Sequence, residues 1–199
     1  MYILRATTHR RMPWRNGCGS TMELLIAPEG ASLERFDVRL SIAQLDAPAP
    51  FSAFPGIERW LLMLEGSVRL EIGDAPGLRL GPEQEAIEFA GEQRVSATPL
   101  ESPAKDLNLM IRRARYRGLL RRLSIAAGAA WQPSATVSAL LCRRGSLAID
   151  VAEKGADADE GPWRLDHEDV LLVEGPRRGA LLLKARPDTQ LYLAEVFER

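Results

Sequence analysis

The 199-residue chain is predicted to be an all-β protein made of two similar halves. Two observations predict this class: many short apolar segments alternate with glycine or proline, and the same set of segments occurs twice. No long stretch shows the 3.6-residue periodicity of an amphipathic helix. Closely spaced strands with turn residues between them are typical of sandwiches and barrels.

Residues 36–43 show the strand pattern most clearly. Phenylalanine, valine, leucine and isoleucine alternate there with aspartate, arginine and serine. A period of two places the two sets on opposite faces of a strand, so we expect this strand to be half-buried. Further strands are expected at 60–64, 67–72, 86–89, 107–112, 139–143, 147–151, 170–173, 180–184 and 191–197.

The second half of the chain repeats the first. The RLSIA sequence at 39–43 recurs at 122–126, and segment 61–72, with its Gly-Ser pair, is matched by 139–149. Segment 78–81 corresponds to 163–166, and 105–110 to 188–193 with a small shift. Four matches in the same order indicate a domain duplication, not a solenoid. We therefore expect one domain over residues 1–117 and a second over 118–199.

Composition excludes several partners. Lys and Arg number 26 against 27 Asp and Glu, so the net charge of −1 predicts neither nucleic acid nor an acidic membrane as a partner. The amino terminus has no apolar signal region and no segment is long enough for a membrane span, so we expect a cytoplasmic protein. Cys18 and Cys142 are too few for a disulfide framework and are expected to be free thiols.

Four segments carry a resemblance to a known family. Residues 14–21 (WRNGCGST), 36–43 (FDVRLSIA), 50–59 (PFSAFPGIER) and 106–113 (DLNLMIRR) resemble the HutD/Ves family of bicupins. Cys18 stands where the family motif has a glycine, while the C-terminal half matches in pattern alone. The resemblance implies two tandem cupin-type, RmlC-like jelly-roll β-barrels, a small-molecule pocket in the first barrel and a degenerate second barrel. It also implies an association with histidine utilisation, without an established reaction.

The metal-binding motif of cupins is not present. Metal-containing cupins carry a motif resembling His-x-His-x4-Glu-x6-Gly, followed by Pro-x-Gly-x-x-His. When Gly66 is aligned with the first motif, Ser52 and Phe54 stand at the histidines and Arg59 at the glutamate. In the second motif, Arg94 stands at the last histidine. A divalent ion prefers imidazole and carboxylate ligands, so we expect no metal and no other cofactor.

Arginines at these positions suggest an anion site instead. Guanidinium groups repel cations and bind carboxylates in a bidentate fork, so Arg59 and Arg94 predict a pocket for a small carboxylate. The alternative is that both arginines lie on the surface and pair with nearby glutamates. His9 and His167, the two histidines of the chain, are expected to be ordinary polar positions.

The loop at 14–21 is a second candidate for the binding site. Its glycines permit positive φ angles and expose N–H groups beside the Trp14 ring, although a plain connecting turn is the alternative. Asn108 shares a strand face with Asp106 and Met110, which predicts either a pocket or a structural polar network. The full set of predicted ligand-binding residues is Trp14, Asn16, Ser20, Thr21, Ser41, Ser52, Phe54, Arg59, Arg94 and Asn108.

Two function classes remain. The first is a metal-free binding protein, with a regulatory role in histidine utilisation, that holds a small carboxylate such as formylglutamate. The second is a metal-independent isomerase, epimerase or lyase, for which Glu58 and Glu65 are possible bases. A carboxylate with a perturbed pKa that faces Arg59 across the pocket would favour the enzyme. Cupins often pair through sheet edges, so a homodimer is a further expectation.

Overall fold

The computed structural model describes residues 1–125, 129–151 and 163–199, which form two compact units. The N-terminal unit comprises His9–Leu120 together with Arg199, and the C-terminal unit comprises Met1–Thr8 and Arg121–Glu198. The described residues are almost entirely strands and loops, with a single 3-10 turn, η1 (Ala6–Thr8). This confirms the predicted all-β class. No described helix has the length and apolar character that crossing a membrane requires.

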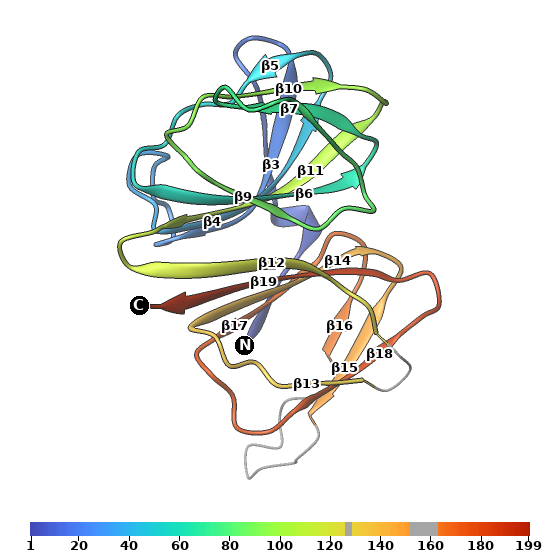
Figure 1. Ribbon diagram of the computed structural model, residues 1–199. Helices are drawn as coiled ribbons and strands as arrows, with labels where there is room; N and C mark the ends of the chain where they lie inside the picture. Colours follow the sequence, from blue (N-terminus) through green and yellow to red (C-terminus); the bar gives the residue numbers. More distant parts are fainter. Residues whose placement is uncertain (126–128, 152–162) are drawn as a thin grey trace. The chain divides into compact units, whose positions relative to one another are not determined.

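The N-terminal unit consists of two antiparallel sheets (Figure 1). The six-stranded sheet has the order β2-β3-β4-β11-β6-β9, and the four-stranded sheet has the order β5-β10-β7-β8. The strands are β2 (Arg10–Pro13), β3 (Gly19–Ala27), β4 (Val38–Leu45), β5 (Ala49–Pro50), β6 (Ile57–Glu65), β7 (Val68–Ile72), β8 (Leu78–Leu80), β9 (Ile87–Ala90), β10 (Val95–Pro99) and β11 (Ala104–Arg112).

The C-terminal unit also consists of two sheets. The five-stranded sheet has the order β1-β17-β14-β19-β12, and the four-stranded sheet has the order β13-β18-β15-β16. The strands are β1 (Tyr2–Leu4), β12 (Tyr116–Leu123), β13 (Ala129–Trp131), β14 (Val137–Arg144), β15 (Leu147–Val151), β16 (Trp163–Leu165), β17 (Val170–Glu174), β18 (Leu181–Ala185) and β19 (Gln190–Glu198). The unit boundary falls within β12.

Strand order confirms the internal duplication. The run β4-β11-β6-β9 corresponds to β12-β19-β14-β17, and β5-β10-β7-β8 corresponds to β13-β18-β15-β16. The matched hairpin glycines, Gly66 and Gly145, both have positive φ angles, 64° and 79°. Each half also has a register shift at the same place, next to this glycine. The strand pairing therefore makes Gln190 the equivalent of Lys105, whereas the sequence repeat suggested residue 188, two positions earlier. Residue 126 of the RLSIA repeat lies outside the described residues.

Each unit has its own hydrophobic core between its two sheets. In the N-terminal unit, Leu61 and Met63 of β6 pack with Leu70 of β7 and Val95 of β10. In the C-terminal unit, the core combines side chains of β14, β17 and β19 with those of β13, β15, β16 and β18. Cys142 belongs to this core and is fully buried, which raises the pKa of its thiol to about 12.

The strand at 36–43 differs from its prediction. It begins at Val38, and both of its faces are buried: Leu40 is 1% exposed and Ser41 is 2% exposed. A half-buried strand was expected because arginine and serine usually face water. In the fold these polar residues face the interior of the N-terminal unit, where they border a cavity.

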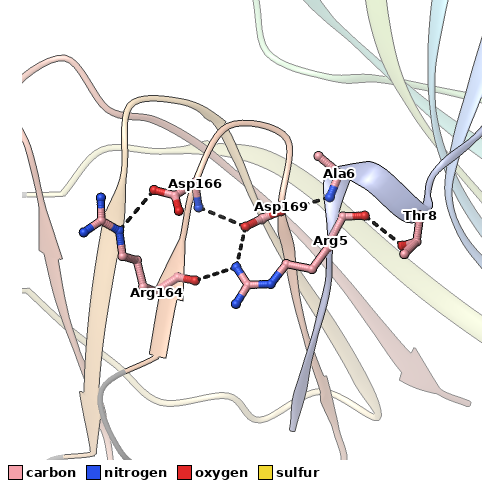
Figure 2. Close-up of polar contacts among 6 residues, drawn as sticks. All are labelled: Arg5, Ala6, Thr8, Arg164, Asp166 and Asp169. Atoms are coloured by element: carbon pink, nitrogen blue, oxygen red, sulfur yellow. Dashed lines mark hydrogen bonds and ion pairs between the residues drawn. The ribbon is translucent and has the colours of Figure 1, made fainter.

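The first eight residues belong to the C-terminal unit, which differs from the expected range of 1–117 for the first domain. Strand β1 pairs with β17, and Figure 2 shows the ion pair that anchors the following turn. The Arg5 guanidinium donates to the Asp169 carboxylate at 2.7 Å, and the Ala6 amide donates to its other oxygen at 2.9 Å. These hydrogen bonds lower the pKa of Asp169 against the opposing effect of its burial.

Two hairpin glycines provide a stability test. Gly66 and Gly73 both have positive φ, but an added Cβ would lie 2.4 Å from the Pro103 carbonyl oxygen at Gly66 and in open space at Gly73. Gly73→Ala should cost about 1–2 kcal/mol of unfolding free energy for the left-handed backbone. Gly66→Ala should cost about 1–3 kcal/mol more because of the steric contact. Equal denaturation midpoints for the two variants would contradict this account.

Candidate functional site

The N-terminal unit contains a cavity of about 580 Å³ that is lined in part by the β2–β3 hairpin. Its walls come from that hairpin, from strands β4, β6 and β11, and from the segment 50–54. The lining residues are Met12, Pro13, Trp14, Arg15, Asn16, Thr21, Leu33, Arg39, Ser41, Ala43, Pro50, Phe51, Ser52, Phe54, Arg59, Asp106, Asn108 and Met110.

Strand register gathers the polar groups on the inner wall. Strand β11 lies between β4 and β6, and Asn108 is paired with Ser41 of β4. One layer further along, Met110 is paired with Arg39 of β4 on one side and Arg59 of β6 on the other. Because alternate residues of a strand share a face, three neighbouring strands direct their polar side chains into one cavity.

Arg59 is the central cationic group of the cavity. It is 6% exposed, and its guanidinium carbon lies 4.8 Å from the Phe51 ring centroid and 5.2 Å from that of Phe89. Its Nη1 donates a long contact of 3.5 Å to the Ser52 carbonyl oxygen. Burial lowers the pKa of Arg59 to about 10, so the group stays charged at neutral pH. Arg59 is therefore not the surface residue that the alternative interpretation expected.

The second cationic group of the inner wall is already neutralised. The Nε of Arg39 donates to the Glu23 carboxylate at 2.8 Å, and the side chains of both residues are largely buried. Within the part of the chain that the structure describes, Arg59 has no such close ion pair. Of the two inner-wall arginines, the one whose charge remains available to a ligand is thus Arg59, while Arg15 lies in the hairpin part of the lining.

Asp106 is the buried acid of the same cavity. It is 8% exposed, and its Oδ1 has no hydrogen-bond partner among the described residues. Burial raises the pKa of Asp106 to about 7, although the charge of Arg59 acts in the opposite direction. The Nε of Arg59 and the Oδ1 of Asn108 are likewise buried without a described partner. Such unsatisfied groups are costly, and here three of them belong to one cavity.

The loop at 14–18 forms part of the cavity wall and is also a turn. The Trp14 Nε1 donates to Thr21 Oγ1 at 2.8 Å, and its amide donates to the Gly19 carbonyl oxygen at 2.9 Å. Gly19 has no room for a side chain, because a Cβ would lie 2.2 Å from the Gln44 carbonyl oxygen. Cys18, in contrast, does not need positive φ, and its side chain packs at the edge of the core. This explains how a family glycine can be replaced there.

Eight of the ten predicted ligand-binding residues line the cavity: Trp14, Asn16, Thr21, Ser41, Ser52, Phe54, Arg59 and Asn108. The structure does not bring Ser20 or Arg94 there. Ser20 alternates with Thr21 on β3 and so points to the opposite face. Arg94 precedes the inward-facing Val95, lies on the outside, and pairs with Asp74 at 2.9 Å with 80% of its side chain exposed. The motif alignment therefore placed Arg94 wrongly.

The predicted ligand-binding set left out Arg39 and Asp106, which both line the cavity, although a pocket was one of the two interpretations for the strand face of Asp106. The signal was available, because Arg39 lies two residues from Ser41 and Asp106 two residues from Asn108, on the same strand faces. The proposed bases Glu58 and Glu65 do not line the cavity. Glu58 alternates with Arg59 on β6, and Glu65 pairs with Lys105 at 3.3 Å.

The described residues contain no group of three His, Cys, Asp or Glu side chains that could hold a metal ion. Ser52, Phe54 and Arg59, which the sequence alignment with the cupin motif predicts at ligand positions, line the cavity, and their side chains do not suit a divalent cation. His167 is exposed near Glu168, with 3.9 Å between Nε2 and the carboxylate. Both cysteines are free.

Comparison with known proteins decides the family. The HutD family profile matches residues 6–193. The chain belongs to the HutD family. It is 34% identical over 176 residues to an uncharacterized 21.2 kDa protein in the hutC 3′ region of Pseudomonas putida, covering 88% of this chain and 87% of that protein. It is 36% identical over 116 residues to protein Ves of Citrobacter koseri, covering 56% and 60% of the two chains.

Several solved structures have the same fold. A conserved protein of unknown function, PA5104 from Pseudomonas aeruginosa PAO1, matches with a TM-score of 0.86 and 31% identity, over 98% of each chain. HutD from Pseudomonas fluorescens SBW25 matches with a TM-score of 0.79 and 26% identity, over 100% and 98%. Oxalate decarboxylase from Bacillus subtilis, at 12% identity and a TM-score of 0.68, covers 100% and 77% and shows the cupin jelly-roll fold alone.

The buried acid predicts a pH-dependent stability difference. Because the pKa of Asp106 is raised from 3.8 to about 7, the stability contributed by its neutral form is complete below pH 3.8 and is lost as the pH rises to 7. Asp106→Asn keeps a neutral side chain at every pH. In thermal unfolding, the melting temperature of the variant should therefore rise relative to that of the wild type between pH 4 and pH 7. Above pH 7 the difference between the two melting temperatures should be constant. A difference independent of pH would contradict the raised pKa.

Proposed function

We propose that this HutD-family protein is a cytoplasmic, metal-free binding protein that holds a small carboxylate, such as formylglutamate, in the cavity of its N-terminal unit. In this proposal, binding serves a regulatory role in histidine utilisation. The observation that carries the proposal is the buried Arg59, a charged donor without a close ion-pair partner among the described residues, facing a cavity of about 580 Å³.

The side chains that line the cavity support a carboxylate as the ligand. A guanidinium group presents donors in a planar fork that matches a carboxylate, and such charge-assisted hydrogen bonds are strongest where water is excluded. Phe51 and Phe54 add apolar wall area beside Arg59, suited to a short carbon chain. The cavity thus combines a few fixed polar groups with apolar walls, as small-molecule sites generally do.

The relatives support the link to histidine utilisation. One matching protein is described by its position in the hutC 3′ region, and one matching structure is HutD itself. The metal-free part of the proposal rests on the side chains of the cavity, where Ser52, Phe54 and Arg59 replace imidazole and carboxylate ligands.

Removal of the Arg59 charge tests the proposal. Arg59→Met keeps an unbranched side chain of comparable reach inside the aromatic wall but removes every guanidinium donor. We expect formylglutamate to raise the melting temperature of the wild type, and the affinity of Arg59→Met to fall by at least about 30-fold, corresponding to about 2 kcal/mol. Calorimetric titration would give the affinity directly.

Arg94→Ala is the matched control. It also removes one arginine, but Arg94 is exposed, pairs with Asp74 and lies outside the cavity. Its affinity for formylglutamate should equal that of the wild type. If wild-type protein shows no thermal shift with formylglutamate or with other small mono- and dicarboxylates, the binding proposal fails.

A second candidate function is a metal-independent enzyme, and Asp106 is the observation that favours it. Asp106 is a carboxylate in the cavity of Arg59 with a pKa of about 7, which is the feature expected of an enzyme in this fold. When ionised, Asp106 could take a proton from the carbon beside a bound carboxylate, and Arg59 would stabilise the negative charge that develops. No second acid of the described cavity lining could return the proton from another side.

Hydrogen–deuterium exchange separates the two functions. With Asp106 as a base, the carbon-bound proton next to the carboxylate of formylglutamate should exchange in D2O, measured by NMR. The rate should rise with pH and level off above about pH 7, because the base must be ionised. Asp106→Asn should abolish the exchange. Binding without exchange would leave the protein as a binder.

A further inference from the structure

Three residues of the cavity lining each carry a buried polar atom without a hydrogen-bond partner among the described residues, and these atoms are of two kinds. The Nε of Arg59 is a donor, whereas the Oδ1 of Asp106 and the Oδ1 of Asn108 are acceptors. All three residues are at least nine-tenths buried, with exposures of 6%, 8% and 5%, and all three line the same cavity. A ligand that only accepts hydrogen bonds would satisfy Arg59 and leave both acceptors empty.

The fold itself does not require these polar groups. In the duplicated C-terminal unit, the register places Leu191 at the position of Asp106 and Leu193 at that of Asn108. Both leucines belong to a packed core and are at most 1% exposed. The same strand positions can therefore be filled by apolar side chains, so the two acceptors of the N-terminal unit have no structural necessity.

Asp106 is the more discriminating of the two acceptors. An amide such as that of Asn108 can rotate by 180° and present its NH2 group instead of its oxygen. An ionised carboxylate has only acceptor oxygens, and it becomes a donor solely by taking up a proton. A ligand atom beside Asp106 must consequently carry hydrogen, or Asp106 must be protonated.

We propose that Asp106, with Asn108, is a specificity determinant that selects carboxylates bearing an N–H or O–H donor close to the carboxylate that Arg59 holds. The ligand class is thus hydroxy, amino or acylamino carboxylates, in preference to plain dicarboxylates and oxo acids. The inference rests on the proposed function, because it assumes that Arg59 binds a carboxylate.

The charged groups around the cavity make the preference depend on pH. Arg59 faces Asp106 from β6, Arg39 from β4 is neutralised by Glu23 of β3, and Arg15 lies in the lining of the hairpin loop. The pKa of Asp106 is about 7, so the group is mostly ionised at pH 8.5 and mostly protonated at pH 5.5. The preference for a donor should be large at pH 8.5 and should decrease at pH 5.5, where a protonated Asp106 can donate to an oxo group.

A matched set of dicarboxylates with a five-carbon backbone tests the inference. The compounds differ at C2: 2-hydroxyglutarate, in each enantiomer, carries a hydroxyl donor; glutarate carries no polar group; 2-oxoglutarate carries an acceptor; and N-formyl-L-glutamate carries an amide N–H. Calorimetric titration of the full chain at pH 8.5 should give at least tenfold tighter binding, or about 1.4 kcal/mol, for one 2-hydroxyglutarate enantiomer and for N-formyl-L-glutamate than for glutarate. 2-Oxoglutarate should bind most weakly.

Asp106→Leu copies the residue at the equivalent position of the second barrel and removes the acceptor. In this variant the donor-bearing and plain ligands should bind with the same affinity to within about twofold, at both pH values. Asp106→Asn is a second variant of nearly the same shape, which should reduce the preference and abolish its pH dependence, while Arg94→Ala should keep both. Thermal unfolding checks that each variant folds.

The outcomes distinguish the two proposals. Equal affinities of the wild type for all ligands would overturn the specificity inference and leave carboxylate binding intact. A preference of wild-type size in Asp106→Leu, or one in Asp106→Asn that still depends on pH, would also overturn it. If none of the ligands binds to the wild type, the proposed function and the inference fail together.

Discussion

The interior of the N-terminal unit is arranged around the charged guanidinium group of Arg59, which would be unstable in a purely apolar core. Burial of an unpaired guanidinium group is expensive, and the structure surrounds Arg59 with the Phe51 and Phe89 rings and a single long contact to the Ser52 carbonyl oxygen. The nearby carboxylate of Asp106 gives electrostatic compensation without a hydrogen bond to its Oδ1. In the proposed function, a ligand that carries the opposite charge would supply the missing partner.

The duplicated architecture shows where the interiors of the two units differ. The two units share the strand order, the positive-φ hairpin glycine and the register shift near the end of the long hairpin. They differ in the side chains that point inward, since Ser138, Leu191 and Leu193 of the C-terminal unit stand where Arg59, Asp106 and Asn108 stand in the N-terminal unit. A few residues on fixed strand positions therefore decide whether the interior is a core or a site.

Most of the fold could be predicted from the sequence, because strand periodicity and the internal repeat are local patterns. The ten expected strands lie within or overlap observed ones, and the repeat matches the duplicated topology. The candidate site was harder to predict from the sequence than the fold. The motif spacing predicted both Arg59 and Arg94 at the pocket. Arg59 lines the cavity, whereas Arg94 is exposed beside the inward-facing Val95, because neighbouring residues of an extended chain face opposite sides.

The amino-acid sequence by itself determined the all-β class, the duplication and the HutD-family membership, since each depends on residue type and spacing alone. Only the tertiary structure decided that Arg39 is neutralised by Glu23, that the first eight residues pair with the C-terminal unit, and that Asp106 shares the cavity of Arg59. These relations join residues distant in the chain, and the burial that raises the pKa of Asp106 exists only once both sheets are packed.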